Sequence, residues 1–133
     1  MEQKTITARW TGPDLEYEGT DSKGNTVKMG GDGPSPSEMV LLGFAGCMGM
    51  DVKAVLNKKR AAVASIDVTV VGHQPESYPK PYKIVEIEFD IRGSNVSPAA
   101  VERAIALSRD KYCIVGQTLQ EPVTLKTSFN ITP

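Results

Sequence analysis

Residues 35–60 read SPSEMVLLGFAGCMGMDVKAVLNKKR, and this stretch predicts the helix around which the rest of the fold is built. Ser35 is a favourable N-cap, Pro36 suits the first helical position, and Glu38 stands three residues after the cap, which completes a capping box. No later proline interrupts the segment, and it ends in the basic run 58–60, where the helix dipole favours positive charge. We therefore predict one long helix from Pro36 to about the end of this run.

The first half of this helix, MVLLGFAGCMGM over residues 39–50, is apolar all round, which predicts burial on most sides. Gly43, Gly46 and Gly49 weaken it by roughly 1 kcal/mol each relative to alanine. We expect the close approach of another backbone to compensate for that loss. A chain of 133 residues has little else with which to cover such a helix, and a homodimer that shares it would do so.

Alternating apolar and polar residues predict strands on both sides of the helix. Before it, the segments Thr5–Trp10, Leu15–Tyr17 and Thr26–Met29 indicate a small antiparallel meander. After it, Ile66–Val70 and Val85–Ile91 each have one apolar and one polar face, as half-buried strands do.

A second helix and a last strand complete the expected order. The helix begins at Ser97 as N-cap with Pro98 at its first position, and it ends near Tyr112–Cys113. Its predicted inner face consists of Val101, Ala104, Ile105 and Ser108. The alternating segment Val123–Ile131 predicts the final strand. The fold class is therefore α+β, with mostly antiparallel strands against two principal helices, in one domain over residues 1–133.

The composition, 40% hydrophobic and 23% charged, is that of an ordinary globular protein. A net charge of −1 gives nucleic-acid binding no support. The N-terminal residues MEQKTITARW lack the apolar core of a signal peptide, and no uninterrupted apolar run approaches the ~18 residues of a membrane span. We therefore expect a cytoplasmic protein with no nucleic-acid and no membrane partner.

Cys47 and Cys113 are the two cysteines of the chain, and their spacing fits neither a CxxC pair nor a familiar zinc pattern. With a single histidine, His73, the sequence predicts no metal site. From residue type alone, the two thiols are either small hydrophobes of the core or a reactive pair that the fold brings together. A catalytic function, if there is one, centres on them.

Two motifs carry a resemblance to a known family. The segment SPSEMVLLGFAGC, residues 35–47, resembles the first cysteine motif of the OsmC/Ohr family, named for osmotically inducible protein C and organic hydroperoxide resistance. The segment SRDKYCIVGQTL, residues 108–119, resembles the second. The order of the predicted elements also matches, so the resemblance covers essentially the whole chain.

This resemblance implies an intertwined homodimer with active sites at the subunit interface. It implies a thiol peroxidase that reduces organic hydroperoxides, and often hydrogen peroxide, in oxidative stress defence. Cys47 would be the peroxidatic nucleophile and Cys113 the resolving thiol. The nucleophile becomes a sulfenic acid, the second thiol condenses with it to a disulfide, and an external dithiol restores both thiols without a further cofactor.

The resemblance also points to supporting residues. Met39, Val40, Leu42 and Phe44 form an apolar wall that would suit an alkyl hydroperoxide, or they are ordinary core and dimer packing. Peroxidase members carry a glutamate directly after the helix-opening proline, whereas here Ser37 takes that place and Glu38 follows. Glu38 is therefore a candidate supporting residue or simply part of the capping box.

Two further residues are candidates for activating the nucleophile. Arg9, the only arginine before the long helix, either takes the place of the family's activating arginine or is a solvated strand residue. His73, with Tyr78 and Tyr82, could act across a dimer interface, or it is a loop histidine without a catalytic task.

Two alternatives to the peroxidase stay open. In the first, the chain is a dimeric stress or binding protein that keeps the fold with little peroxidase activity and holds a small apolar ligand in an interface cleft. In the second, both thiols are packing residues. The separation of the Cys47 and Cys113 sulfurs, and the charged group nearest to them, distinguish these interpretations.

Overall fold

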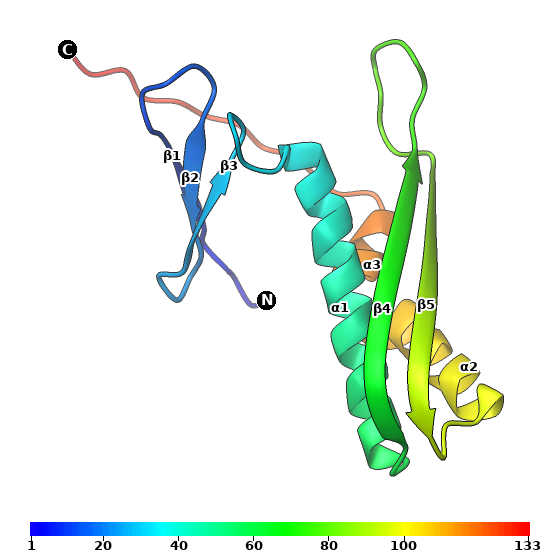
Figure 1. The fold of residues 1–133 in the computed structure, drawn as a ribbon. Coiled ribbons are helices and arrows are strands. Elements are labelled where there is room, and N and C mark those ends of the chain that lie inside the picture. The colour runs from blue at the N-terminus through cyan, green and yellow to red at the C-terminus, as the bar shows by residue number, and fades with distance from the viewer. The chain divides into compact units, whose positions relative to one another are not determined.

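The computed structural model describes all of residues 1–133 and confirms the α+β class, with strands, a long helix, a strand hairpin and further helices in chain order (Figure 1). The chain forms two compact units, Met1–Leu42 and Gly43–Pro133, and each is described by itself. The assignment of residues 1–133 to a single domain stays a prediction.

The first unit contains the predicted meander. Strands β1 (Thr7–Trp10), β2 (Tyr17–Thr20) and β3 (Thr26–Met29) form an antiparallel sheet in the order β1-β2-β3. In the turn between β2 and β3, the Asp21 carboxylate accepts hydrogen bonds from the backbone of residues 23 and 25. Gly24 supplies the positive φ, +92°, that this tight turn requires.

Helix α1 spans Pro36–Lys58 and begins as the sequence predicts. The backbone N–H of Glu38 donates to the Ser35 hydroxyl at 3.3 Å, which is the N-cap half of the capping box. The helix ends two residues before the predicted end, because Arg60 adopts a left-handed backbone with φ of +58°.

Burial of α1 differs from the prediction. Within the chain the buried side chains follow one stripe at every fourth position, Phe44, Met48, Val52 and Leu56. Leu42 and Met50 are 61% and 75% exposed, so the expected burial on most sides is wrong for the single chain. A Cβ added at Gly43 or Gly46 would meet nothing within 4 Å, so no backbone of this chain approaches them closely.

By length and composition alone α1 could cross a membrane, since an 18-residue window has a mean hydropathy of 1.7. The core helix of a soluble protein has the same properties. The buried stripe of α1 packs on a strand hairpin through Val52 and Leu56, which contact Ile66, Phe89 and Ile91. Helix α1 is therefore a core helix.

That hairpin consists of β4 (Ala62–His73) and β5 (Ile84–Ser94), paired antiparallel with Ile66 opposite Ile91 and Val70 opposite Ile87. Both strands are longer than predicted, and His73, expected in the linker, is the last residue of β4. The predicted alternation is confirmed over residues 66–70 and 85–91, where the apolar side chains are half-buried and the polar ones exposed. The apolar face of the hairpin thus forms the surface on which the helices pack.

The second predicted helix divides into several pieces. Helix α2 (Pro98–Leu107) starts at the predicted N-cap, where the Ser97 hydroxyl accepts from the N–H of Ala100 at 3.2 Å. It continues as one π-helical turn, η1 (Ser108–Tyr112), and ends where predicted. The chain then turns at Cys113 and forms a short helix that the sequence did not predict, α3 (Ile114–Gln120).

The predicted final strand is wrong for the single chain. Residues 121–133 have no regular secondary structure, although Val123–Ile131 alternates as a strand does. Leu125, Phe129 and Ile131 are more than 80% exposed. A strand needs a neighbour for its backbone hydrogen bonds, and no strand of this chain pairs with this segment.

Candidate active site

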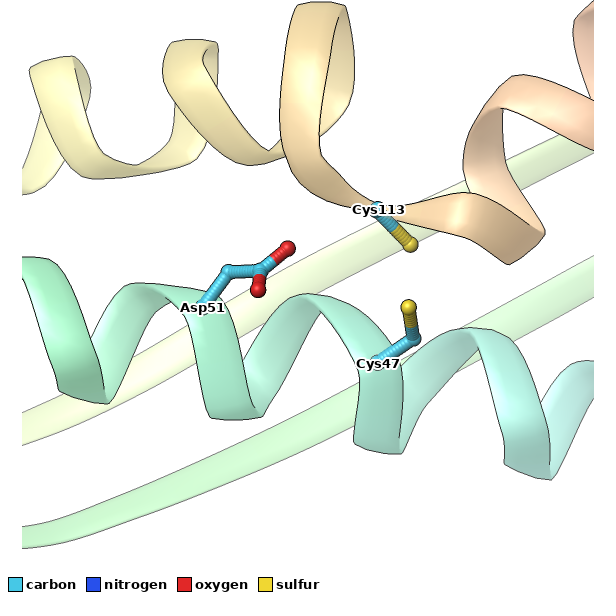
Figure 2. A group of neighbouring side chains, drawn as sticks. All are labelled: Cys47, Asp51 and Cys113. Atoms are coloured by element: carbon cyan, nitrogen blue, oxygen red, sulfur yellow. The ribbon is translucent and has the colours of Figure 1, made fainter. Parts of the chain in front are cut away.

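The structure brings the two cysteines together. Cys47 lies on α1 and Cys113 between η1 and α3, and their sulfurs and a carboxylate oxygen of Asp51 all lie within 4.8 Å of one another. Figure 2 shows the two sulfurs pointing toward each other, with the Asp51 carboxylate beside them. Both cysteines are free thiols, Cys47 half-buried and Cys113 fully buried. Their proximity fits a reactive pair.

Helix geometry places Asp51 in this cluster. Asp51 follows Cys47 by four residues, so both side chains lie on one face of α1. It is the first charged residue of the helix after Glu38 and stands in an otherwise apolar segment. The sequence therefore contained one local indication of this residue, a charge that ends the apolar run one turn after Cys47.

The π-turn η1 supplies the other side of the cluster. It is closed by the Cys113 N–H, which donates to the Ser108 carbonyl at 2.8 Å. Single π-turns inserted in helices are frequent at functional sites. Ser108 and Cys113 are both fully buried, and both face α1, since the Ser108 hydroxyl bonds to Asp51 and the Cys113 sulfur points toward Cys47 (Figure 2).

Ser108 fixes the orientation of Asp51. Its hydroxyl donates to Oδ2 of Asp51 at 2.8 Å, and Ser108 is the one buried polar residue of the chain. A hydrogen bond to an ionised acceptor is stronger than one between neutral groups. The predicted inner face of the second helix included Ser108, but its role as a partner of Asp51 could not be predicted from that pattern.

The environment of Cys113 favours its neutral thiol. Burial raises the pKa of Cys113 to about 11, and its hydrogen bond to Cys47 raises the pKa as well. The N–H of Gly116 donates to the Cys113 sulfur at 3.2 Å and lowers the pKa, while the negative charges of Cys47 and Asp51 raise it. At neutral pH Cys113 is therefore protonated and can donate its S–H to Cys47.

A cavity of about 450 Å³ lies next to the pair. Phe44 and Met48, which line it, also pack directly against Cys113. Val85, Ile87, Ile105 and Leu119 add apolar wall, and Lys83 and Arg109 add positive charge. The cavity therefore offers an apolar space with cationic groups, separated from the buried thiol by one layer of side chains.

The apolar wall predicted from the sequence is placed only in part. Phe44 lines the cavity described above. Met39 is half-buried, while Val40 and Leu42 are exposed. Their assignment to a substrate pocket stays a prediction.

The predicted supporting residues also stay predictions. Glu38 is exposed in the first turn of α1, and Arg9 is exposed on β1 opposite Glu18. Nε2 of His73 lies 3.0 Å from Oε2 of Glu86 at the exposed end of β4. Tyr82 lines the cavity, whereas Tyr78 is exposed and lies under the Lys80 ammonium.

The side chains of the cluster are also potential metal ligands. Two thiols and one carboxylate provide three potential ligands, and a closed tetrahedral zinc site needs a fourth. The histidine of the chain pairs with Glu86 instead.

Comparison with known proteins identifies the family. The family model described as OsmC-like protein matches residues 29–128, most of the chain and both cysteines. The chain belongs to the OsmC-like family. A curated relative of this OsmC-like protein is Protein YhfA of Escherichia coli K12, 32% identical over 121 residues, which cover 88% of this chain and 90% of YhfA.

Solved structures share the OsmC-like fold. A hypothetical protein from Aquifex aeolicus has a TM-score of 0.82 at 32% identity, covering 90% of this chain and 89% of that one. The organic hydroperoxide resistance protein OhrB of Bacillus subtilis has a TM-score of 0.56 at 14% identity, covering 90% and 91%. At that identity OhrB shares the fold alone.

Proposed function

We propose that this OsmC-like protein is a thiol peroxidase that reduces organic hydroperoxides through Cys47 and Cys113. The observation that carries the proposal is the placement of the two sulfurs within 4.8 Å of each other, with the Cys113 thiol kept neutral mainly by burial. Two cysteines that only filled the core would not need this arrangement.

The first step takes place at Cys47, the half-buried and therefore more accessible thiol. Its thiolate attacks the terminal oxygen of the hydroperoxide, the O–O bond breaks, and the alkoxide leaves with a proton as an alcohol. Cys47 is oxidised to the sulfenic acid. The S–H of Cys113, donated to Cys47, stabilises the thiolate before the attack.

The second step forms the disulfide. The Cys113 sulfur attacks the Cys47 sulfur, the S–O bond breaks, and the hydroxyl leaves as water. An external dithiol then reduces the disulfide by exchange and restores both thiols. The apolar cavity beside Cys113 supports an organic peroxide in preference to hydrogen peroxide alone.

The proposed enzyme is a cytoplasmic homodimer with its active sites at the subunit interface. The exposed apolar side chains of α1, such as Leu42 and Met50, support this assembly because a second copy would remove them from water. The alternating segment Val123–Ile131, which has no strand partner in its own chain, supports it as well. Arg9, Glu38 and His73 stay candidate residues for assisting Cys47 in such a dimer.

The test is steady-state reduction of tert-butyl hydroperoxide by the protein with a dithiol reductant. Cys47→Ser is expected to abolish turnover, and Cys113→Ser to allow one turnover followed by over-oxidation of Cys47 to the sulfinic acid. Multiple turnover by Cys47→Ser at the wild-type rate would refute the assignment of the nucleophile.

The cavity favours one second candidate, a dimeric stress protein that binds a small apolar ligand and has little peroxidase activity. Its apolar walls, together with Lys83 and Arg109, suit an amphipathic or aromatic molecule. Calorimetric titration with decanoate separates the two functions. Binding by a protein that consumes no hydroperoxide would favour this candidate, whereas rapid single-turnover oxidation of Cys47 would exclude it.

A further inference from the structure

The carboxylate of Asp51 is the charged group of the thiol cluster. It takes no part in the peroxidase steps proposed for Cys47 and Cys113. It lies within 4.8 Å of both sulfurs on the half-buried face of α1. A negative charge beside two thiols opposes the formation of thiolates, so it is not there to activate Cys47. The buried hydroxyl of Ser108 nevertheless holds it in place at 2.8 Å.

Disulfide formation poses a proton problem in this site. The attacking Cys113 is fully buried and carries its proton at neutral pH. The attack releases that proton, and the departing hydroxide needs one to leave as water. Bulk water does not reach a fully buried sulfur, and the carboxylate of Asp51 is the basic group that lies within 4.8 Å of it.

We propose that Asp51 is the proton relay of the disulfide-forming step and that Ser108 is its positioning residue. The inference rests on the proposed function, because it concerns the sulfenic acid of Cys47. As the Cys113 sulfur bonds to the Cys47 sulfur, the Cys113 proton passes to the Asp51 carboxylate. The S–O bond breaks, and the same carboxyl gives a proton to the departing hydroxide. One water leaves, and Asp51 ends as it began.

The geometry suits this relay. A carboxylate has two oxygens with about four lone-pair positions, so Asp51 can accept a proton while Oδ2 is bonded to Ser108. The bond from Ser108 keeps the carboxylate beside the sulfurs, where a free side chain would rotate toward water. General acid–base assistance of this kind contributes typically ~10²–10⁴-fold to a rate.

A purely electrostatic role for Asp51 makes the opposite prediction. The charge of Asp51 raises the pKa of Cys113. If that charge acted only electrostatically, its removal would yield more Cys113 thiolate and faster disulfide formation. If Asp51 relays the proton, its removal slows the step. The sign of the change therefore decides between the two roles.

The test compares wild type, Asp51→Asn and Asp90→Asn, the last an exposed carboxylate of β5 as matched control. Reduced protein receives one equivalent of tert-butyl hydroperoxide between pH 5.5 and 9. Mass spectrometry of quenched samples then measures the amounts of sulfenic acid and disulfide. We expect Asp51→Asn to form disulfide about 100-fold more slowly at pH 7, at the lower end of the range for general acid–base catalysis. Sulfenic acid formation should change little, and Asp90→Asn should match wild type.

The pH profile is a second readout of the same variants. The groups that titrate around Cys113 are Cys47 and Asp51, while the cations Lys83 and Arg109 line the neighbouring cavity. Disulfide formation by wild type should vary little from pH 6 to 8. In Asp51→Asn it should rise about tenfold per pH unit, because the rate then follows the fraction of Cys113 thiolate, whose pKa is about 11. Disulfide formation by Asp51→Asn at the wild-type rate or faster overturns the inference.

Two further measurements keep the inference testable. If Asp51→Asn does not fold, wild type is measured in heavy water, where absence of a solvent isotope effect on disulfide formation overturns the relay. If Cys47 does not react with peroxide, the proposed function fails, but the relay can still be tested. Dithionitrobenzoate then replaces the peroxide and forms a mixed disulfide with Cys47. Cys113 then displaces thionitrobenzoate from Cys47 and again loses a proton. Slower release in Asp51→Asn supports proton acceptance by Asp51, and unchanged or faster release overturns it.

Discussion

Ser108 and Asp51 lie 57 positions apart in the sequence, and the Ser108 hydroxyl donates a 2.8 Å hydrogen bond to Oδ2 of Asp51. This bond joins the π-turn η1 to helix α1 at the level of the thiol pair. It places a carboxylate where the sulfurs meet, and it satisfies a hydroxyl that no solvent reaches. The pair thereby links the stability of the fold to the chemistry of the site.

Replacement of Ser108 tests the contribution of this bond to stability. Ser108→Ala removes the donor and leaves the part-buried Asp51 carboxylate without it, which should lower the free energy of unfolding by about 1–3 kcal/mol. Urea unfolding of the reduced protein measures it. The exposed Ser94→Ala at the end of β5 is the control and should stay within about 0.5 kcal/mol of wild type. Equal stability of the two variants would contradict the assigned role of the bond.

Stability at alkaline pH should depend on Cys113. Its pKa is raised from 9.0 to about 11, mainly by burial, so the folded state retains a proton that the unfolded chain loses. This contribution is complete below pH 9 and is lost as the pH rises toward 11. Two pKa units correspond to about 2–3 kcal/mol.

Urea unfolding of reduced wild type and Cys113→Ser from pH 8 to 11 measures this contribution. Serine does not ionise in that range, so the variant should lose less stability than wild type over the interval. If the free energy of unfolding fell equally in the two proteins, the pKa of Cys113 would be the same in the folded and unfolded states, contrary to the prediction.

Gly46 tests the proposed homodimer. A Cβ at Gly46 would meet nothing within 4 Å of its own chain, so alanine there should favour the helix by about 1 kcal/mol unless another chain packs on it. We expect Gly46→Ala to weaken dimer association, measured by analytical ultracentrifugation. Gly49→Ala is the control, because its Cβ would lie at an ordinary 3.6 Å from Val68 of the same chain. Equally tight association of Gly46→Ala and wild type would argue against packing at this position.

Gly116 tests the packing between the cavity and Cys113. A Cβ at this position would lie 3.2 Å from Cε1 of Phe44 and 3.4 Å from the Cys113 sulfur, closer than most contacts of a methyl group. Gly116→Ala should cost about 1–3 kcal/mol of stability, as overpacking does. In a double-mutant cycle the smaller side chain of Phe44→Leu should recover part of that cost. If the stability changes of the two substitutions simply added, the contact between Phe44 and the new methyl group would not be the source of the strain.

The sequence predicted those elements whose signals are local. The capping box at Ser35 and Glu38 and the Ser97-Pro98 pair located both helix starts, because capping depends on residues a few positions apart. Alternation located β4 and β5 for the same reason. The final strand failed because alternation shows which side chains share a face, but not which neighbour supplies the hydrogen bonds.

The site was predictable only in its cysteines, and they came from the two family motifs. Asp51 has a local signal, a lone charge one turn after Cys47, but its partner Ser108 is 57 positions away. Helix α3 was missed because it begins with Ile114, Val115 and Gly116, which favour helices weakly. Its N-cap is the side chain of Cys113, an unusual residue for that position.

The most direct test of the central claim is the intact mass of the protein after one equivalent of tert-butyl hydroperoxide. The account predicts that reduced wild type loses two hydrogen atoms as Cys47 and Cys113 form a disulfide within the chain, and that peptide mapping finds this bond. Cys113→Ser should instead gain one oxygen atom at Cys47. Wild type that keeps its mass and both free thiols would contradict the proposed function.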